Sequence, residues 1–367
     1  MKCIRCNHDS KKSERTADVC PNCRKPFAFD PTTGDAFTDQ KFANALERVS
    51  SGGTVRFTVN NLYFELSRSI RAGSAGLFTP GAGRTEQDAR TAITITLALN
   101  VAFVFVAALV FWPLAIPLSL FAAYLLHRRS QVSSDRTVAI NLGDANALLA
   151  KWTHAHGSPK GLIVRKDAPK PKALPPDLRH YSFDRAVITD TAETVDMLVA
   201  NNFHFENNCA ILAVTGYPEG VFKTVLAMLR NNPRLRVYAL HDASVRGVTL
   251  ASELSHSPHW FQGTGATVID VGLHVAHVDA FRGSWEVQSP AADLSRIPPD
   301  SYEWLSQYSL PLAVVRPEQT IKRLFRAMTQ ESDPVLVTGA ETMLLASDTS
   351  SFSSDATSSD GGGDSFG

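Results

Sequence analysis

Four of the five cysteines fall within the first 23 residues, as two Cys-x-x-Cys pairs separated by thirteen residues. The pairs are Cys3 with Cys6 in CIRC, and Cys20 with Cys23 in CPNC. Two such turns can present four thiolates in the tetrahedral arrangement that Zn²⁺ prefers. Two disulfides or a redox pair are the alternatives, but so short a polar segment needs a metal in order to fold. We therefore predict that residues 1–30 form a zinc ribbon around a structural Zn²⁺.

Carboxylates follow apolar segments in the second half of the chain. Asp190 comes directly after RAVIT, Glu219 lies in the loop after CAILAVT, and Asp242 comes two residues after VYAL. Continuous apolar strands that alternate with helices indicate a parallel sheet covered on both faces. The sites of such sheets lie beyond the carboxyl ends of the strands. The sequence therefore predicts a four-stranded α/β domain over residues 181–330, with polar groups gathered at one edge.

The order of these features resembles a Toprim domain. An acid follows the first strand, TGYPEG follows the second, HDAS follows the third, and DVGL marks the fourth. This pattern is similar to the Toprim of the topoisomerase VI A subunit and of the related meiotic double-strand-break proteins. The resemblance covers roughly residues 183–283 and implies a parallel, Rossmann-like sheet with a Mg²⁺ site for phosphodiester cleavage. It places Asp190 at the family's glutamate position and Asp242 at the first position of its Asp-x-Asp pair.

Two positions depart from that family. Ser244 stands where the second aspartate is expected, and replacing a carboxylate by a hydroxyl weakens Mg²⁺ binding because the ion prefers anionic oxygen ligands. Glu219 is a further candidate acid. The stretch TVNNLYFELSR also resembles the helix that carries the family's tyrosine nucleophile. In this comparison Phe64 replaces the nucleophile and has no attacking oxygen, while its neighbour Tyr63 is either the paired aromatic or a core residue.

These departures predict a degenerate Toprim-like domain that binds, scaffolds or senses, with nucleic acid or a nucleotide as candidate ligands. One alternative is a Mg²⁺-dependent nuclease or phosphotransferase that uses Asp190, Asp242 and Glu219. Another is a structural membrane adaptor whose ribbon and acidic tail recruit protein partners. The chain carries 36 Lys and Arg residues and 36 Asp and Glu residues, so its overall charge does not indicate a nucleic-acid partner.

Residues 91–126 contain no charged side chain. One straight helix of this length would extend about 54 Å, well beyond a hydrocarbon core of about 30 Å. Pro113 and Pro117 interrupt it, so we predict a transmembrane helical hairpin over residues 91–127. Basic residues flank both ends, which places both on the cytoplasmic side. The chain is therefore expected in the inner (cytoplasmic) membrane, its soluble domains facing the cytoplasm. A helical hairpin buried in a soluble core is the alternative.

Residues 37–72 are typical of a small helical module, and a winged helix is one arrangement that fits. Thr38 can cap a first helix whose apolar residues lie on one face, and Gly52 follows its expected end. TVRFTV, residues 54–59, alternates like a strand. A second helix is expected directly after it, with Thr58 or Asn60 as its cap.

Residues 130–180 are expected to form a small α/β extension followed by a linker. TVAINL, residues 137–142, is typical of a strand, and Asp144 is the expected cap of the helix after it. The run RKDAPKPKALPPDLR indicates a stiff, solvated spacer. Residues 347–367 are acidic and rich in Ser and Gly, so they cannot bury enough apolar surface to fold and are expected to be disordered.

Other residue types with chemical potential are assigned to the fold. His256, His259, His274 and His277 are candidate metal ligands, but the last two lie near the end of an apolar strand, where hydrogen-bonded histidines are common. We therefore predict no second zinc site from the sequence. Cys209 opens an apolar strand and is expected to be packed. GYPEGVFK lacks the order of glycines and lysine that defines a P-loop.

Overall fold

The computed structural model describes residues 1–74, 137–164, 183–288 and 297–329, apart from 16–17, 32–34 and 298. No helix within these ranges is long and apolar enough to cross a membrane. The hairpin predicted at 91–127, the tail at 347–367 and most of the spacer before residue 183 lie outside the described residues, so these predictions stay as predictions.

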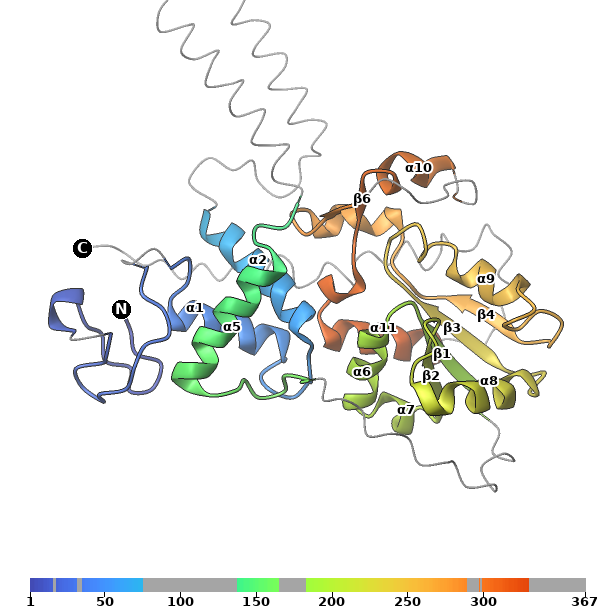
Figure 1. Ribbon diagram of the computed structural model, residues 1–367, viewed down its shortest axis with the longest axis horizontal. Helices are drawn as coiled ribbons and strands as arrows, with labels where there is room; N and C mark the ends of the chain where they lie inside the picture. Colours follow the sequence, from blue (N-terminus) through green and yellow to red (C-terminus); the bar gives the residue numbers. More distant parts are fainter. Residues whose placement is uncertain are drawn as a thin grey trace, which may run out of the picture.

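A four-stranded parallel sheet forms the centre of the second half of the chain, which confirms the predicted α/β fold (Figure 1). Its spatial order is β2-β1-β3-β4, so consecutive strands are joined by helical crossovers. The pairing register aligns the strands at both ends, with Thr189 of β1 opposite Ala213 and Leu240. The strands are β1 (Arg185–Thr189), β2 (Cys209–Ala213), β3 (Arg236–Leu240) and β4 (Thr267–Asp270).

Helices cover both faces of this sheet. Side chains alternate along each strand, so Val187 and Tyr238 belong to one buried cluster while Ile188 and Ala239 belong to the other. Figure 1 shows α6 and α11 on one side of the strands and α8 and α9 on the other. These helices are α6 (Ala192–Ala200), α8 (Phe222–Arg230), α9 (Leu250–His256) and α11 (Pro317–Thr329).

Three helices form the first half of the described chain: α1 (Asp39–Val49), α2 (Val59–Ser74) and α5 (Leu142–His156). Thr38 caps α1 as predicted, because its side chain accepts a hydrogen bond from the Lys41 N–H at 3.2 Å. The strand predicted at 54–59 is wrong. Phe57 makes only an isolated bridge to Leu162, and α2 already begins at Val59, where the side chain of Thr58 takes the capping position.

The strand predicted at 137–142 is also wrong. Thr137 makes a single bridge to Trp285, and α5 already begins at Leu142. Its cap is Asn141 instead of Asp144: the Asn141 side chain accepts from the Asp144 N–H at 2.8 Å. An early cap ends the extended run because it satisfies a helical N–H group.

Short elements connect the larger ones. A two-stranded antiparallel ribbon pairs residues 286–287 with 308–309 and lies near η5 and α10. The remaining elements are η1 (Lys12–Glu14), α7 (Phe203–Glu206), η4 (Glu219–Val221), η5 (Val275–Phe281), β5 (Glu286–Val287), α10 (Pro299–Leu305), β6 (Tyr308–Ser309) and η6 (Leu312–Val314).

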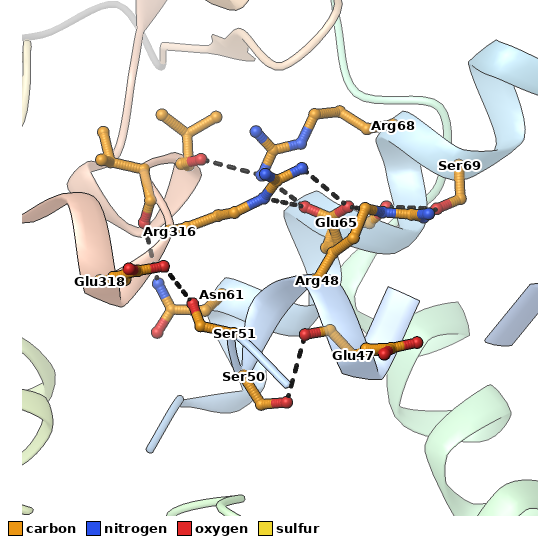
Figure 2. A network of polar contacts seen from close by, with 12 residues as sticks. Glu47, Arg48, Ser50, Ser51, Asn61, Glu65, Arg68, Ser69, Arg316 and Glu318 are labelled. Carbon is orange, nitrogen blue, oxygen red and sulfur yellow. Dashed lines mark hydrogen bonds and ion pairs between the residues drawn. The ribbon is translucent and has the colours of Figure 1, made fainter. Parts of the chain in front are cut away.

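A buried carboxylate joins the helical module to the end of the α/β domain. Glu65 of α2 is only 2% exposed, and its oxygens lie 2.6 Å from Arg48 Nε, 3.1 Å from Arg68 Nη2 and 3.2 Å from Arg316 Nε. Figure 2 shows these arginines converging on Glu65 from α1, from α2 and from the residue directly before α11. Burial by itself raises the pKa of Glu65, but the three arginines overcome that effect and the pKa lies below its usual value.

Candidate metal centre and carboxyl-edge pocket

The four N-terminal cysteines form one compact group. Cys3 Sγ lies 3.7 Å from Cys23 Sγ, and Cys6 Sγ lies 3.7 Å from Cys20 Sγ. All four sulfurs lie within 4.8 Å of one another, and none is in a disulfide. Zn–S bonds of about 2.3 Å in a tetrahedron place sulfurs about 3.8 Å apart, so the thiols are spaced as zinc ligands would be. The residues predicted to bind zinc therefore form a group that can hold a metal such as zinc.

Two similar turns produce this spacing. The Asn7 N–H donates to the Cys3 carbonyl and the Arg24 N–H donates to the Cys20 carbonyl, both at 2.9 Å. Asn7 and Arg24 both adopt left-handed backbone conformations, with φ of 57° and 54°. Each turn thereby folds its second cysteine back toward the first.

The thiols of the group differ in acidity. The N–H of His8 lowers the pKa of Cys6 to about 6, with further help from neighbouring side chains. The N–H of Lys25 acts in the same direction on Cys23, but burial and the other thiols outweigh it and raise that pKa to about 11. A cation in the middle of the group would remove this competition, because it favours all four thiolates at once.

The ribbon contacts α1 and α5. Arg5 Nη2 donates to the Ala155 carbonyl at the end of α5 at 2.7 Å. Asp39, at the start of α1, accepts from the Ala28 and Phe29 N–H groups, and its Oδ2 lies 2.6 Å from His156 Nε2. The carboxyl end of the ribbon is therefore anchored by one buried carboxylate to α1 and α5.

Asp190 and Asp242 meet at the carboxyl edge of the sheet, since they follow the neighbouring strands β1 and β3. The Asp242 N–H donates to Asp190 Oδ2 at 2.8 Å, and the Leu312 N–H donates to Asp242 Oδ1 at 2.6 Å. Burial raises the pKa of Asp190. Burial, reinforced by the charge of Asp190, raises the pKa of Asp242 to about 8. These two acids therefore resist ionisation, and one oxygen of each already accepts a backbone hydrogen bond.

The other two residues predicted at this edge do not join them. Ser244 Oγ accepts from the Gly247 N–H at 3.1 Å, which closes a turn. Glu219 is exposed in η4. Among the described residues, the groups of three or more metal-ligating side chains do not include Asp190, Asp242 or Glu219. The geometry therefore gives no support to the predicted Mg²⁺ site.

A pocket of about 330 Å³ opens beside Asp242. Tyr63 and Phe64 of α2 reach it, with ring centroids 4.7 Å apart, so the aromatic pair and the acid line one space. We call it the carboxyl-edge pocket; it is lined by Thr58, Asn60, Asn61, Tyr63, Phe64, Leu142, Thr191, Glu193, Thr194, Met197, Asp242, Glu286, Pro311, Leu312, Ala313 and Thr320. Among the residues that the structure describes, this lining contains three acids and no lysine or arginine.

Sequence reasoning missed Glu286, which lies in β5 and lines the same pocket. Burial raises its pKa. Burial and, to a smaller degree, Glu286 raise the pKa of Tyr63 to about 12. No sequence pattern connects Glu286 with Tyr63, because only the tertiary fold brings residue 286 back over α2.

A second polar group lies at the ends of β3 and β4. His241 is fully buried, with Nε2 3.0 Å from Asp270 Oδ1, and His274 Nε2 lies 3.3 Å from the same oxygen. Sequence reasoning passed over His241 and Asp270, although both end neighbouring strands of the sheet. The structure brings His274 to this group and leaves His256 and His259 exposed.

The electrostatics of this group are strongly coupled. Burial by itself lowers the pKa of His241, but its contacts with Asp270 overcome that effect and raise it. Burial opposes ionisation of Asp270, and the two histidines hold its pKa far below its usual range. Burial lowers the pKa of the adjacent His277 to about 3, so that ring is neutral at physiological pH.

Basic residues gather at the opposite, amino edge of the sheet. A hollow of about 440 Å³ is lined there by three arginines, Arg185, Arg234 and Arg236, together with Asp184, Asn207 and Asn208. The two ends of the sheet therefore differ in charge, with acids at the carboxyl edge and arginines at the amino edge.

No family model, curated protein or solved structure matches this chain.

Proposed function

We propose that this chain is a membrane-anchored zinc-ribbon protein whose degenerate Toprim-like domain binds a ligand and does not cleave phosphodiesters. One observation carries the proposal: one oxygen of Asp190 and one oxygen of Asp242 accept hydrogen bonds from the N–H groups of Asp242 and Leu312. A catalytic Mg²⁺ requires several oxygen ligands turned toward one point. Here the two acids hold loop backbone through hydrogen bonds. Ser244, the residue that departs from the family pattern, closes a turn.

The carboxyl-edge pocket supports a ligand that is neutral or positively charged. A cation would favour the ionised forms of its acids, Glu193, Asp242 and Glu286, whereas a phosphate would meet no cationic side chain among the described residues that line it. Amide and hydroxyl groups from Asn60, Thr191 and other lining residues offer hydrogen bonds. The nucleic acid or nucleotide expected from the resemblance fits the arginine-lined amino edge better than this pocket.

Two further features support the rest of the proposal. The uncharged stretch at 91–126 is long enough for a membrane anchor, with flanking basic residues that favour the cytoplasmic face for the soluble parts. The ribbon is a compact unit seated on α5 through Arg5 and on α1 through Asp39. We expect a protein partner to bind its exposed surface.

The catalytic alternative is tested with the full-length chain and supercoiled DNA in Mg²⁺ or Mn²⁺. We expect no nicking by the wild type or by Asp242→Asn. Asp279→Asn, which changes an exposed acid outside the pocket, is the matched control. Metal-dependent nicking that Asp242→Asn abolishes and Asp279→Asn preserves would overturn the proposal in favour of a Toprim-type nuclease.

Ligand preference is tested by thermal unfolding with two probes of opposite charge. Spermidine should raise the melting temperature of the wild type, and Glu286→Gln should reduce that rise because it removes an acid from the pocket. ATP should give a smaller rise that does not respond to Glu286→Gln. A response of ATP, and not of spermidine, to this substitution would contradict a cation-preferring pocket.

A further inference from the structure

We propose that His241, Asp270 and His274 form a second metal site, which takes a borderline divalent transition ion of the Zn²⁺ class. The site lies at the ends of β3 and β4, apart from the cysteine group and built from different ligand chemistry. Its three ligand atoms, two imidazole nitrogens and one carboxylate oxygen, lie within 4.8 Å of one another.

The distances match those between the ligands of one ion. Metal bonds of about 2.0–2.1 Å place two ligand atoms about 3.0 Å apart at a right angle and about 3.4 Å apart at the tetrahedral angle. His241 Nε2 lies 3.0 Å and His274 Nε2 lies 3.3 Å from Asp270 Oδ1. A small movement of Asp270 away from the two rings would admit an ion between the three groups.

The hydrogen bonds around His241 orient it as a metal ligand. Its Nδ1 lies 2.8 Å from the Asp242 carbonyl oxygen, and because a carbonyl only accepts, Nδ1 carries the proton. Nε2 is then the nitrogen that faces Asp270 and His274. Metal-binding histidines characteristically donate their second N–H to a carbonyl or carboxylate in this way.

One oxygen of Asp270 is crowded with neighbours. Besides both histidine nitrogens, the Gly272 N–H donates to Asp270 Oδ1 at 3.1 Å. A single carboxylate oxygen offers two lone pairs, too few for three donors. An ion resolves this crowding, because the imidazoles then offer it lone pairs and no longer compete as donors for one oxygen.

The backbone is shaped to hold this arrangement. A Cβ at Gly272 would come within 2.4 Å of the His241 ring, so only glycine lets the β4 end approach the imidazole. The N–H of His274 donates to His277 Nδ1 at 3.0 Å, which fixes the turn that returns His274 to the site. Both contacts position ligands.

The choice of ion follows from the ligand set. Two imidazoles and one carboxylate suit Zn²⁺, Fe²⁺ or Co²⁺, whereas Mg²⁺ and Ca²⁺ prefer oxygen ligands. His274 is 20% exposed and Asp270 is 12% exposed, so water can reach the ion and complete its shell. Three protein ligands with an open position are typical of metal sites that bind or activate a small molecule.

The test counts metal ions in the full-length chain after chelator treatment and reloading with Zn²⁺ or Co²⁺ under reducing conditions. We expect two ions per chain in the wild type, one in the cysteine group and one in the new site. Asp270→Asn and His274→Gln should each bind one. His259→Gln, at an exposed histidine elsewhere, is the matched control and should bind two.

Co²⁺ separates the two sites by colour. The cysteine group should give intense thiolate-to-cobalt charge-transfer bands in all variants, while the second ion should add only weak visible bands that Asp270→Asn and His274→Gln remove. Circular dichroism confirms that each variant is folded, and His274 is chosen because it is partly exposed. A single ion in the wild type, or two ions in both site variants, would overturn the proposal and leave His241 as a partner in a buried ion pair.

Discussion

Glu65 and Asp242 are both acids that pack against the same short segment, residues 310–316, yet their surroundings oppose each other. Glu65 receives the guanidinium of Arg316 from this segment and those of Arg48 and Arg68 from its own module. Asp242 receives the N–H of Leu312 and lies beside a second acid, Asp190. The pKa of Glu65 is accordingly lowered and that of Asp242 raised to about 8.

The difference separates an acid that stabilises the fold from one that the fold tolerates. The three arginines offset the free-energy cost of burying the Glu65 carboxylate. Loss of this carboxylate would leave the positive charges of the arginines without their anionic partner. Backbone N–H groups orient Asp242 but do not neutralise it. Buried acids without a full set of charge-compensating partners are common at ligand sites. Of these two acids, Asp242 is the one that lines a pocket.

The largest effect is expected from Glu65→Gln. Removing one partner of a buried ion network costs about 3 kcal/mol, which corresponds to a fall in melting temperature of roughly 6–12 °C. Glu47→Gln, at an exposed acid of α1 drawn in Figure 2, should change the melting temperature by less than about 2 °C. Thermal unfolding of both variants checks this, and equal melting temperatures would remove Glu65 from its stabilising role.

The same network predicts a pH dependence. Because folding lowers the pKa of Glu65, its stabilising effect is complete above its usual value of 4.5 and is lost as the pH falls through the lowered value. The gap in melting temperature between wild type and Glu65→Gln should therefore be constant near neutrality and narrow in acid. A pH series of thermal unfolding curves measures the gap, and a gap that widens in acid would contradict the assignment.

Asp242→Asn should not lower the stability of the fold, in contrast to Glu65→Gln. The amide oxygen still accepts from the Leu312 N–H, and a permanently neutral side chain replaces an acid whose ionised form the fold disfavours, so stability should stay equal or rise by about 1 kcal/mol. Thermal unfolding at neutral pH, with Asp279→Asn as the exposed control, measures the change. A clear loss of stability in Asp242→Asn alone would show that its charge is needed, and the contrast with Glu65 would fail.

The smallest effect is expected at the surface of α11. Lys322 Nζ lies 2.6 Å from Glu318 Oε1, but the lysine is 62% exposed. Such pairs four residues apart on a helix contribute about 0.3–0.5 kcal/mol and are screened by salt. Lys322→Gln should lower the melting temperature by about 1 °C in low salt and leave it unchanged in high salt; an effect as large as that of Glu65→Gln would show that burial is not what separates these acids.

The parts of the structure that sequence predicted depend on local patterns. The spacing of Cys3, Cys6, Cys20 and Cys23 determines the geometry of the cysteine group, because each pair is closed by its own turn. The apolar strands and their helical crossovers define a parallel sheet, and chain order alone then places Asp190 and Asp242 at one edge. The hairpin and the tail lie outside the residues that could check them.

The missed features depend on distant parts of the chain. Leu312 lies 70 residues after the Asp242 carboxylate that it serves, and Arg316 lies 251 residues after Glu65. No periodicity within a window of ten or twenty residues contains such pairs. Tertiary contacts also override local preference at Phe57, where an alternating stretch forms a loop that buries Phe57 and Thr58 and makes a single bridge instead of a strand.

During synthesis on the ribosome, residues 310–316 are made long after the residues that they contact. At roughly 5–20 residues per second, Glu65 emerges roughly 13–50 seconds before Arg316. During that interval the helical module has Arg48 and Arg68 but lacks its third guanidinium, and the Asp242 loop has no Leu312 to hold it. A nascent chain released before residue 310 would therefore carry two defects at once, one on each side of the missing segment.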